Sequence, residues 1–115
     1  MSKFWKAAIG TTLLLASTMS QAGWSVLGHR DVYRVVLISP ADISNNSVYW
    51  DAMRTLCNKT FCNVVFVANE SDMAVATSRQ LSKQERENAL MIYTTNSGFS
   101  WNCSMRPNAD NCFQW

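Results

Sequence analysis

His29 and the four cysteines are the residues of this chain whose types could support catalysis or metal binding. His29 is the only histidine among 115 residues, and Arg30 and Asp31 follow it directly. A Ser-His-Asp or Cys-His nucleophilic system would have to use this one side chain. We interpret it as an exposed histidine in the segment that leads into the first predicted strand. One histidine and four thiols could ligate zinc. We expect no metal and no cofactor, because the N-terminus has the pattern of a secretory signal peptide and an exported chain would oxidise its thiols.

The cysteines are interpreted as structural. They are Cys57, Cys62, Cys103 and Cys112. Thioredoxin-type chemistry uses Cys-x-x-Cys at a helix N-terminus, where the thiol pKa falls. Here the first spacing is Cys-x4-Cys, and Cys57 lies at the C-terminal end of a predicted helix, which opposes thiolate formation. Four cysteines allow three pairings. Of these we expect the near neighbours, Cys57 with Cys62 and Cys103 with Cys112, each stabilising the fold by roughly 2–3 kcal/mol.

Glu70 and Asp72 are the acidic residues best placed for acid–base work. They follow the second predicted strand, and ligands often bind beyond the carboxyl edge of a parallel sheet. Together with His29 they give the alternative function, a small periplasmic enzyme. We favour a solvated loop, because the sequence has no Gly-rich phosphate loop, no His-Glu metalloprotease motif and no Gly-x-Ser-x-Gly elbow.

Several aromatic residues lie close to the last two cysteines. Trp101 is two residues before Cys103, and Phe113 and Trp115 follow Cys112. Tryptophan is enriched in binding hot spots, but it also packs over disulfides in small domains. We hypothesise that Trp101, Phe113 and Trp115 contact a partner, with core packing as the alternative.

The N-terminus has the pattern of a secretory signal peptide. Lys3 and Lys6 precede an apolar run at residues 7–16, and Ser20 and Ala22 occupy the −3 and −1 positions of a cleavage site. The run is about half of the roughly 20 apolar residues that a membrane span needs. We therefore predict a cleaved leader at residues 1–22 and a single domain at residues 23–115, located in the periplasm or secreted.

Cleavage changes the charge of the working protein. Removing 22 of the 115 residues leaves 93, and the loss of two lysines takes the formal net charge from +2 to zero. A neutral chain has no long-range field that attracts phosphates or anionic lipid. We expect no nucleic-acid partner and no membrane span after cleavage; another protein is the expected partner.

The order of elements predicts a small α/β domain. Residues 32–39 have apolar, often β-branched side chains at both odd and even positions, which indicates a strand covered on both faces. A helix with one apolar face is predicted from residues 45–47 to about Asn58, and residues 62–68 form a second strand. Strand, helix and strand of these lengths are typical of a parallel βαβ unit with a right-handed crossover.

The second half of the chain is predicted to add a helix and a short strand. Ser82 and Glu85 form a capping box, from which a helix extends over residues 83–94, burying Ala89, Leu90, Ile92 and Tyr93. A turn at residues 96–98 leads to a strand at residues 99–103, and a tail closed by Cys112 ends the domain. The predicted fold is therefore an α/β domain with two disulfides.

Short motifs around the cysteines add a resemblance. Leu56-Cys57, the run from Cys62 to Phe66, Trp101-Asn102-Cys103 and Cys112 resemble a loose group of small exported bacterial proteins. The resemblance implies an exported bacterial domain closed by disulfides, and it carries no activity. The function expected from the sequence is that of an exported non-enzymatic binding protein, such as an inhibitor, an immunity-type protein or an accessory subunit of an envelope assembly.

Overall fold

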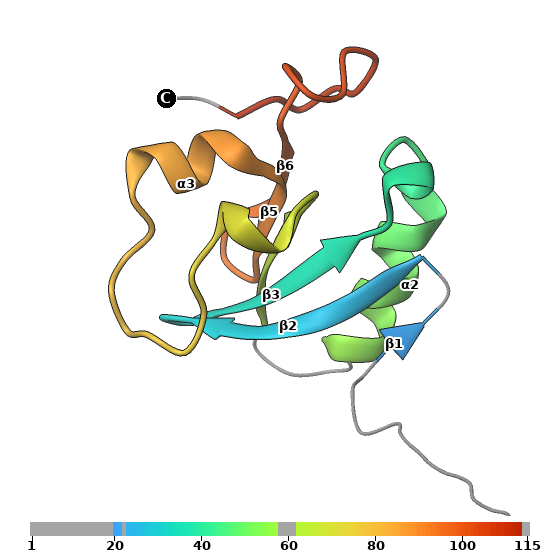
Figure 1. Cartoon of the computed structure of the whole chain (residues 1–115). Helices are drawn as coiled ribbons and strands as arrows, with labels where there is room; N and C mark the ends of the chain where they lie inside the picture. The colour runs from blue at the N-terminus through green and yellow to red at the C-terminus, as the bar shows by residue number, and fades with distance from the viewer. Residues whose placement is uncertain (1–19, 22, 58–61, 114–115) are drawn as a thin grey trace, which may run out of the picture.

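A single mixed β-sheet organises the chain (Figure 1). The computed structural model describes residues 20–21, 23–57 and 62–113. The strands are β1 (Ser20–Gln21), β2 (Trp24–Arg30), β3 (Tyr33–Ile38), β4 (Asn63–Val67), β5 (Ala89–Thr94) and β6 (Gly98–Trp101). The helices are α2 (Asn46–Leu56) and α3 (Lys83–Asn88), with short 3-10 helices at η3 (Pro40–Asp42) and η4 (Glu70–Asp72). The protein is thus a small α/β domain in which five strands of four or more residues carry the sheet.

The strands lie in the sheet in their order along the chain, from β1 to β6. All neighbours are antiparallel except β3 and β4, which are parallel, with Val36 opposite Phe66. Parallel neighbours need a crossover connection, and the chain between β3 and β4 contains α2. That these three elements form a right-handed βαβ unit stays a prediction.

Most of the predicted leader lies outside the described residues. Ser20 and Gln21 are the exceptions, and they pair with Ser25 and Trp24 at the edge of the sheet. Cleavage before Gly23 would remove this two-residue pairing and leave β2 as the edge strand. Within the described residues, neither helix has the length and apolar character that crossing a bilayer demands.

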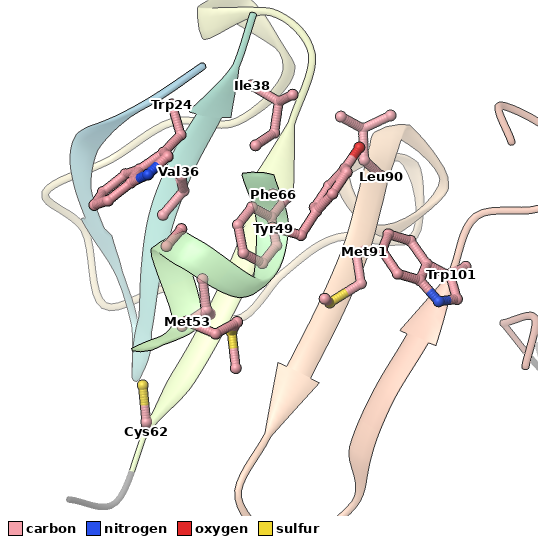
Figure 2. Close-up of a cluster of buried hydrophobic side chains, with 12 residues drawn as sticks. Trp24, Val36, Ile38, Tyr49, Met53, Cys62, Phe66, Leu90, Met91 and Trp101 are labelled. Atoms are coloured by element: carbon pink, nitrogen blue, oxygen red, sulfur yellow. The ribbon is translucent and has the colours of Figure 1, made fainter. Parts of the chain in front are cut away.

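The two central strands, β3 and β4, have buried residues on both faces, as the sequence predicts for residues 32–39. Every residue of β4 is buried. Val64 and Phe66 face α2, where they join the larger hydrophobic cluster (Figure 2). Val65 and Val67 face the opposite side and pack with Met73 and other residues of the second cluster. The core therefore has two layers, one on each face of the sheet.

Helix α2 begins and ends close to where the sequence predicts. The Asn45 side chain accepts a hydrogen bond from the backbone N–H of Ser47, which caps the first turn. Tyr49, Ala52 and Met53 form its buried face. The helix ends at Leu56, and the following Cys57 is bonded to Cys62 at the start of β4.

The prediction of one helix over residues 83–94 is wrong in its second half. The capping box at Ser82 and Glu85 is present, but α3 ends at Asn88 and Ala89 is already extended, with ψ of 144°. The next six residues form β5, which pairs with β4 on one side and β6 on the other. A central position in a sheet satisfies the backbone groups of these residues on both sides and buries Leu90 and Met91, which overrides the helical spacing.

The segment before β3 is also more ordered than the sequence predicts. It forms β2, in which His29 is exposed and lies opposite Arg34. The register shifts between Val26 and Gly28, and Gly28 has a φ of 148°. A β-bulge of this kind breaks the alternation by which a strand is detected in a sequence.

Candidate functional site

The residues of the predicted enzyme alternative do not form a site. His29 lies near the C-terminal end of β2, whereas Glu70 and Asp72 lie in η4 beyond the C-terminal end of β4. Because β2 is antiparallel to β3 and β3 is parallel to β4, these are opposite ends of the sheet. None of the three lines a pocket described below. In the described part of the chain, no group of three or more His, Cys, Asp or Glu side chains is placed to hold a metal ion.

All four cysteines are in disulfides. Cys57 is bonded to Cys62, and Cys103 to Cys112, which confirms the pairing expected from near neighbours. The second bond closes a ring of residues 103–112, hereafter the disulfide ring. The first disulfide therefore links the end of α2 to the start of β4, and the second closes the disulfide ring after β6.

The aromatic residues hypothesised to contact a partner differ in their exposure. The Trp101 side chain is only 3% exposed, because its ring packs edge-on against Tyr49 at 4.8 Å and lies 5.9 Å from Phe99. Phe113 is half-buried against the second core cluster. Trp115 lies outside the described residues. Trp101 is thus part of the core, the alternative that the sequence left open.

Two arginines, Arg30 and Arg106, are the buried charged residues of the described chain. A buried charge is stable only where hydrogen bonds and a counter-charge replace water. The two arginines differ in how many of their N–H donors have acceptors within the protein, and this difference separates a structural role from a binding role.

Arg30 is completely satisfied by the protein. Its Nε donates to the carbonyl of Arg79 at 2.7 Å, and Nη1 and Nη2 donate to the carbonyls of Ala74 and Gln80. Both of these nitrogens also donate to the carboxylate of Glu85, which closes a bidentate ion pair. All five N–H donors of the guanidinium have acceptors. The side chain thus fastens the segment between η4 and α3 to the end of β2, and its role is structural.

The ion pair makes stability depend on acid pH. The hydrogen bonds from Arg30 lower the pKa of Glu85 from 4.5 to about 2. A carboxyl whose pKa falls on folding contributes stability that is present above its unfolded pKa and lost as the pH falls through its folded pKa. We expect Glu85 to contribute about 3 kcal/mol above pH 5 and to lose this between about pH 5 and pH 2.

Urea denaturation at several pH values measures this dependence. Glu85→Gln removes the titrating group, so its free energy of unfolding should be lower at neutral pH and change less over the acid range. An equally steep acid dependence in Glu85→Gln would contradict the assignment to Glu85.

Arg106 lacks these compensations. It lies in the disulfide ring and is 8% exposed. Its Nη2 donates to Asn46 Oδ1 at 2.6 Å and to the carbonyl of Ser44 at 3.4 Å. Its Nε and Nη1 are shielded from solvent and have no hydrogen-bond acceptor among the described residues. No ion pair joins it to a carboxylate in this part of the chain. Unmatched buried donors of a charged group are costly, by more than the roughly 1–3 kcal/mol of a neutral group.

The aromatic core compensates the Arg106 charge in part. The guanidinium carbon lies 4.2 Å from the centroid of the Trp101 ring and 5.3 Å from that of Tyr49, which allows cation–π attraction. Burial raises the pKa of Tyr49 to about 12, against the opposing effect of the Arg106 charge. Tyr49 therefore stays protonated, and its hydroxyl donates to the carbonyl of Ile43 at 2.7 Å. It is a hydrogen-bond donor in the core and not a base.

A polar pocket of about 320 Å³ lies beside Arg106. We call it the Arg106 pocket. One wall comes from the residues at the start of α2 and the other from the disulfide ring. Its lining residues are Ser44, Asn46, Trp101, Arg106, Pro107, Asn108, Ala109 and Asp110.

The base of the disulfide ring is fixed by a buried asparagine. Asn102 is 5% exposed, and its Nδ2 donates to the carbonyls of Glu87 and Ala89 at the junction of α3 and β5. The backbone carbonyl of Asn102 accepts a hydrogen bond from the backbone N–H of Arg106 at 2.9 Å. The position of Arg106 is therefore set by the core, by Asn102 and by the disulfide together.

Comparisons with protein-family models, with curated proteins and with solved structures found no match for this chain. The resemblance to small exported bacterial proteins stays a prediction.

Sequence reasoning missed both buried arginines. Neither lies in a motif, and the main partner of each is far along the chain: Glu85 is 55 residues from Arg30, and Asn46 is 60 from Arg106. The only available signal for Arg106 was a cation in a short ring that follows a tryptophan.

Proposed function

We propose that this chain is an exported, non-enzymatic binding protein whose partner docks at the Arg106 pocket. The observation that carries the proposal is the buried guanidinium of Arg106, whose Nε and Nη1 have no acceptor among the described residues. Proteins seldom leave buried donors unmatched, and a functional role is one explanation for those that persist. A partner that supplies a hydrogen-bond acceptor to Nε or Nη1 would remove the free-energy cost of leaving these donors unmatched.

The chemistry of the pocket supports binding over catalysis. Of its lining residues, Asp110 is the one carboxylic acid, and Tyr49, whose ring contacts the Arg106 guanidinium, is held protonated. The three residues of the enzyme alternative lie elsewhere. General acid–base catalysis needs a proton acceptor and donor that converge on one substrate position, and the described pocket walls offer Asp110 alone.

The compartment is part of the proposal. Two disulfides suit an oxidising environment, and the sequence of the first 22 residues has the pattern of an export signal. We place the mature domain in the periplasm or outside the cell, where its partner is another protein of the envelope or its surroundings.

Site-specific crosslinking tests the position of the docking surface. A photo-crosslinking amino acid replaces Asn108, an exposed residue of the pocket wall. A second protein carries it at Lys83, an exposed residue of α3 outside the pocket. We expect the Asn108 protein, expressed in its own host and irradiated, to form a discrete crosslinked species that the Lys83 protein does not form. The proposal fails if neither position crosslinks, or if Lys83 forms the same species.

A further inference from the structure

We infer that the group bound in the Arg106 pocket is a carboxylate. This inference rests on the proposed function and names the chemistry of the ligand at the same site. Three features of the described residues carry it: the unpaired guanidinium, the start of α2 in the pocket wall, and the size and rim charge of the pocket.

The first feature is a positive charge without a counter-charge. Arg106 uses the two N–H donors of Nη2 within the protein and leaves those of Nε and Nη1 unmatched. An ionised oxygen acceptor forms a stronger hydrogen bond with a guanidinium than a neutral acceptor does. An anion is therefore the ligand that compensates this side chain best.

The second feature is the N-terminal end of α2. Two residues in the pocket wall mark this end: Asn46 is the first residue of the 11-residue helix, and Ser44 lies two residues before it. The positive end of the helix dipole favours an anion there, and the first turn of α2 contains no acidic residue that would occupy this role. Two independent sources of positive potential therefore act on one pocket.

The third feature distinguishes a carboxylate from a larger or more highly charged anion. The pocket volume of about 320 Å³ is at the small end of ligand sites. The Asp110 carboxylate lies in the same lining and repels a dianion such as phosphate more strongly than a monoanion. A single carboxylate fits both restrictions.

Direct contact requires a small movement of the site. Nε and Nη1 have almost no accessible surface, so the guanidinium must turn toward the pocket when the ligand enters. The long 3.4 Å contact from Nη2 to the carbonyl of Ser44 is the weaker of its two hydrogen bonds and the one that this rotation breaks.

NMR titration of the wild-type protein tests the inference without any mutation. The probes are acetate, N-acetylglycine, N-acetylglycinamide and inorganic phosphate, and the readout is the ¹H–¹⁵N signal of Arg106 Nε together with the indole N–H of Trp101. We expect both carboxylates to shift these signals saturably, whereas the amide leaves them unchanged and phosphate binds more weakly. A tighter fit for N-acetylglycine identifies the end of a polypeptide as the source, and equal affinity for acetate identifies a free carboxylate.

Other results would overturn the inference. Equal shifts with N-acetylglycine and its amide would show that the peptide group is recognised, equal or tighter binding of phosphate would show a general anion site, and no saturable shift would show no such site. The crosslinking at Asn108 does not depend on the charge of the ligand, so it separates failure of this inference from failure of the proposed function.

A charge placed inside the protein provides a second test. Asn46→Asp puts a carboxylate where Asn46 Oδ1 now accepts from Arg106 at 2.6 Å. It supplies the missing counter-charge and an acidic residue in the first turn of α2. We expect carboxylate affinity to fall by about tenfold or more, the fold-change of a lost charged hydrogen bond, while the thermal midpoint rises.

The matched control is Asn96→Asp, the same change of charge at an exposed position in the turn between β5 and β6. It should leave both carboxylate affinity and the thermal midpoint unchanged. A lower thermal midpoint for Asn46→Asp, or an equal loss of affinity in both variants, would contradict the charge assignment.

Discussion

Arg30→Ala should lower the free energy of unfolding by about 3–5 kcal/mol, the cost of removing one partner from a buried ion pair. The change leaves the Glu85 carboxylate, which is 16% exposed, without its cation. It also removes the donors to the carbonyls of Ala74, Arg79 and Gln80. Since small domains have total stabilities of about 5–15 kcal/mol, the loss should be visible as a large shift of the urea midpoint.

Two variants control this experiment. Arg54→Ala removes an arginine from the exposed Arg54–Asp51 pair, whose side chains are 72% and 46% exposed, and should change stability by less than about 0.5 kcal/mol. Arg30→Lys keeps the charge but offers three donors in place of five, so it should recover only part of the loss. A stability for Arg30→Ala within the range of Arg54→Ala would show that the network does not stabilise the fold.

Trp101→Ala is the second substitution with a large expected effect, about 3–5 kcal/mol for truncation of a large buried aromatic residue. The ring is 3% exposed and lies among Tyr49, Trp50 and Phe99. It also carries the guanidinium of Arg106 on its face. The truncation therefore opens a cavity in the larger core cluster and removes the cation–π support of the pocket. Urea denaturation measures the first effect.

Met105→Ala is the control for Trp101. Met105 lies in the disulfide ring and is 39% exposed, so its truncation should change stability by no more than about 0.5 kcal/mol. Trp101→Phe retains an aromatic ring and should lose less than Trp101→Ala. If Trp101→Ala were as stable as Met105→Ala, the placement of Trp101 in the core would be wrong.

The central part of the fold was readable from local sequence patterns. The strand over residues 32–39, the helix that begins near Asn45 and the strand over residues 62–68 each carry a clear period, and the structure has β3, α2 and β4 at these places. Of the three possible disulfide pairings, the structure has the one expected between near neighbours.

The regions predicted wrongly are those where tertiary pairing decides. Residues 89–94 have apolar side chains at a spacing that fits a helix, but their position between β4 and β6 makes them a strand. β2 was missed for a different reason, because the bulge at Gly28 breaks the alternation of its side chains. The candidate site could not be predicted, because it depends on a contact between the disulfide ring and the start of α2 across 60 residues.

The sequential order of the strands bears on how the molecule reaches its native state. Every hydrogen-bonded pair of strands joins neighbours along the chain, and the disulfides join cysteines only 5 and 9 residues apart. Local closures cost less chain entropy than distant ones, so each hairpin and each covalent bridge can form without waiting for a remote segment. Oxidation of the four thiols therefore has little opportunity to trap a mispaired chain, and we expect the reduced protein to regain its native bridges without a dedicated isomerase.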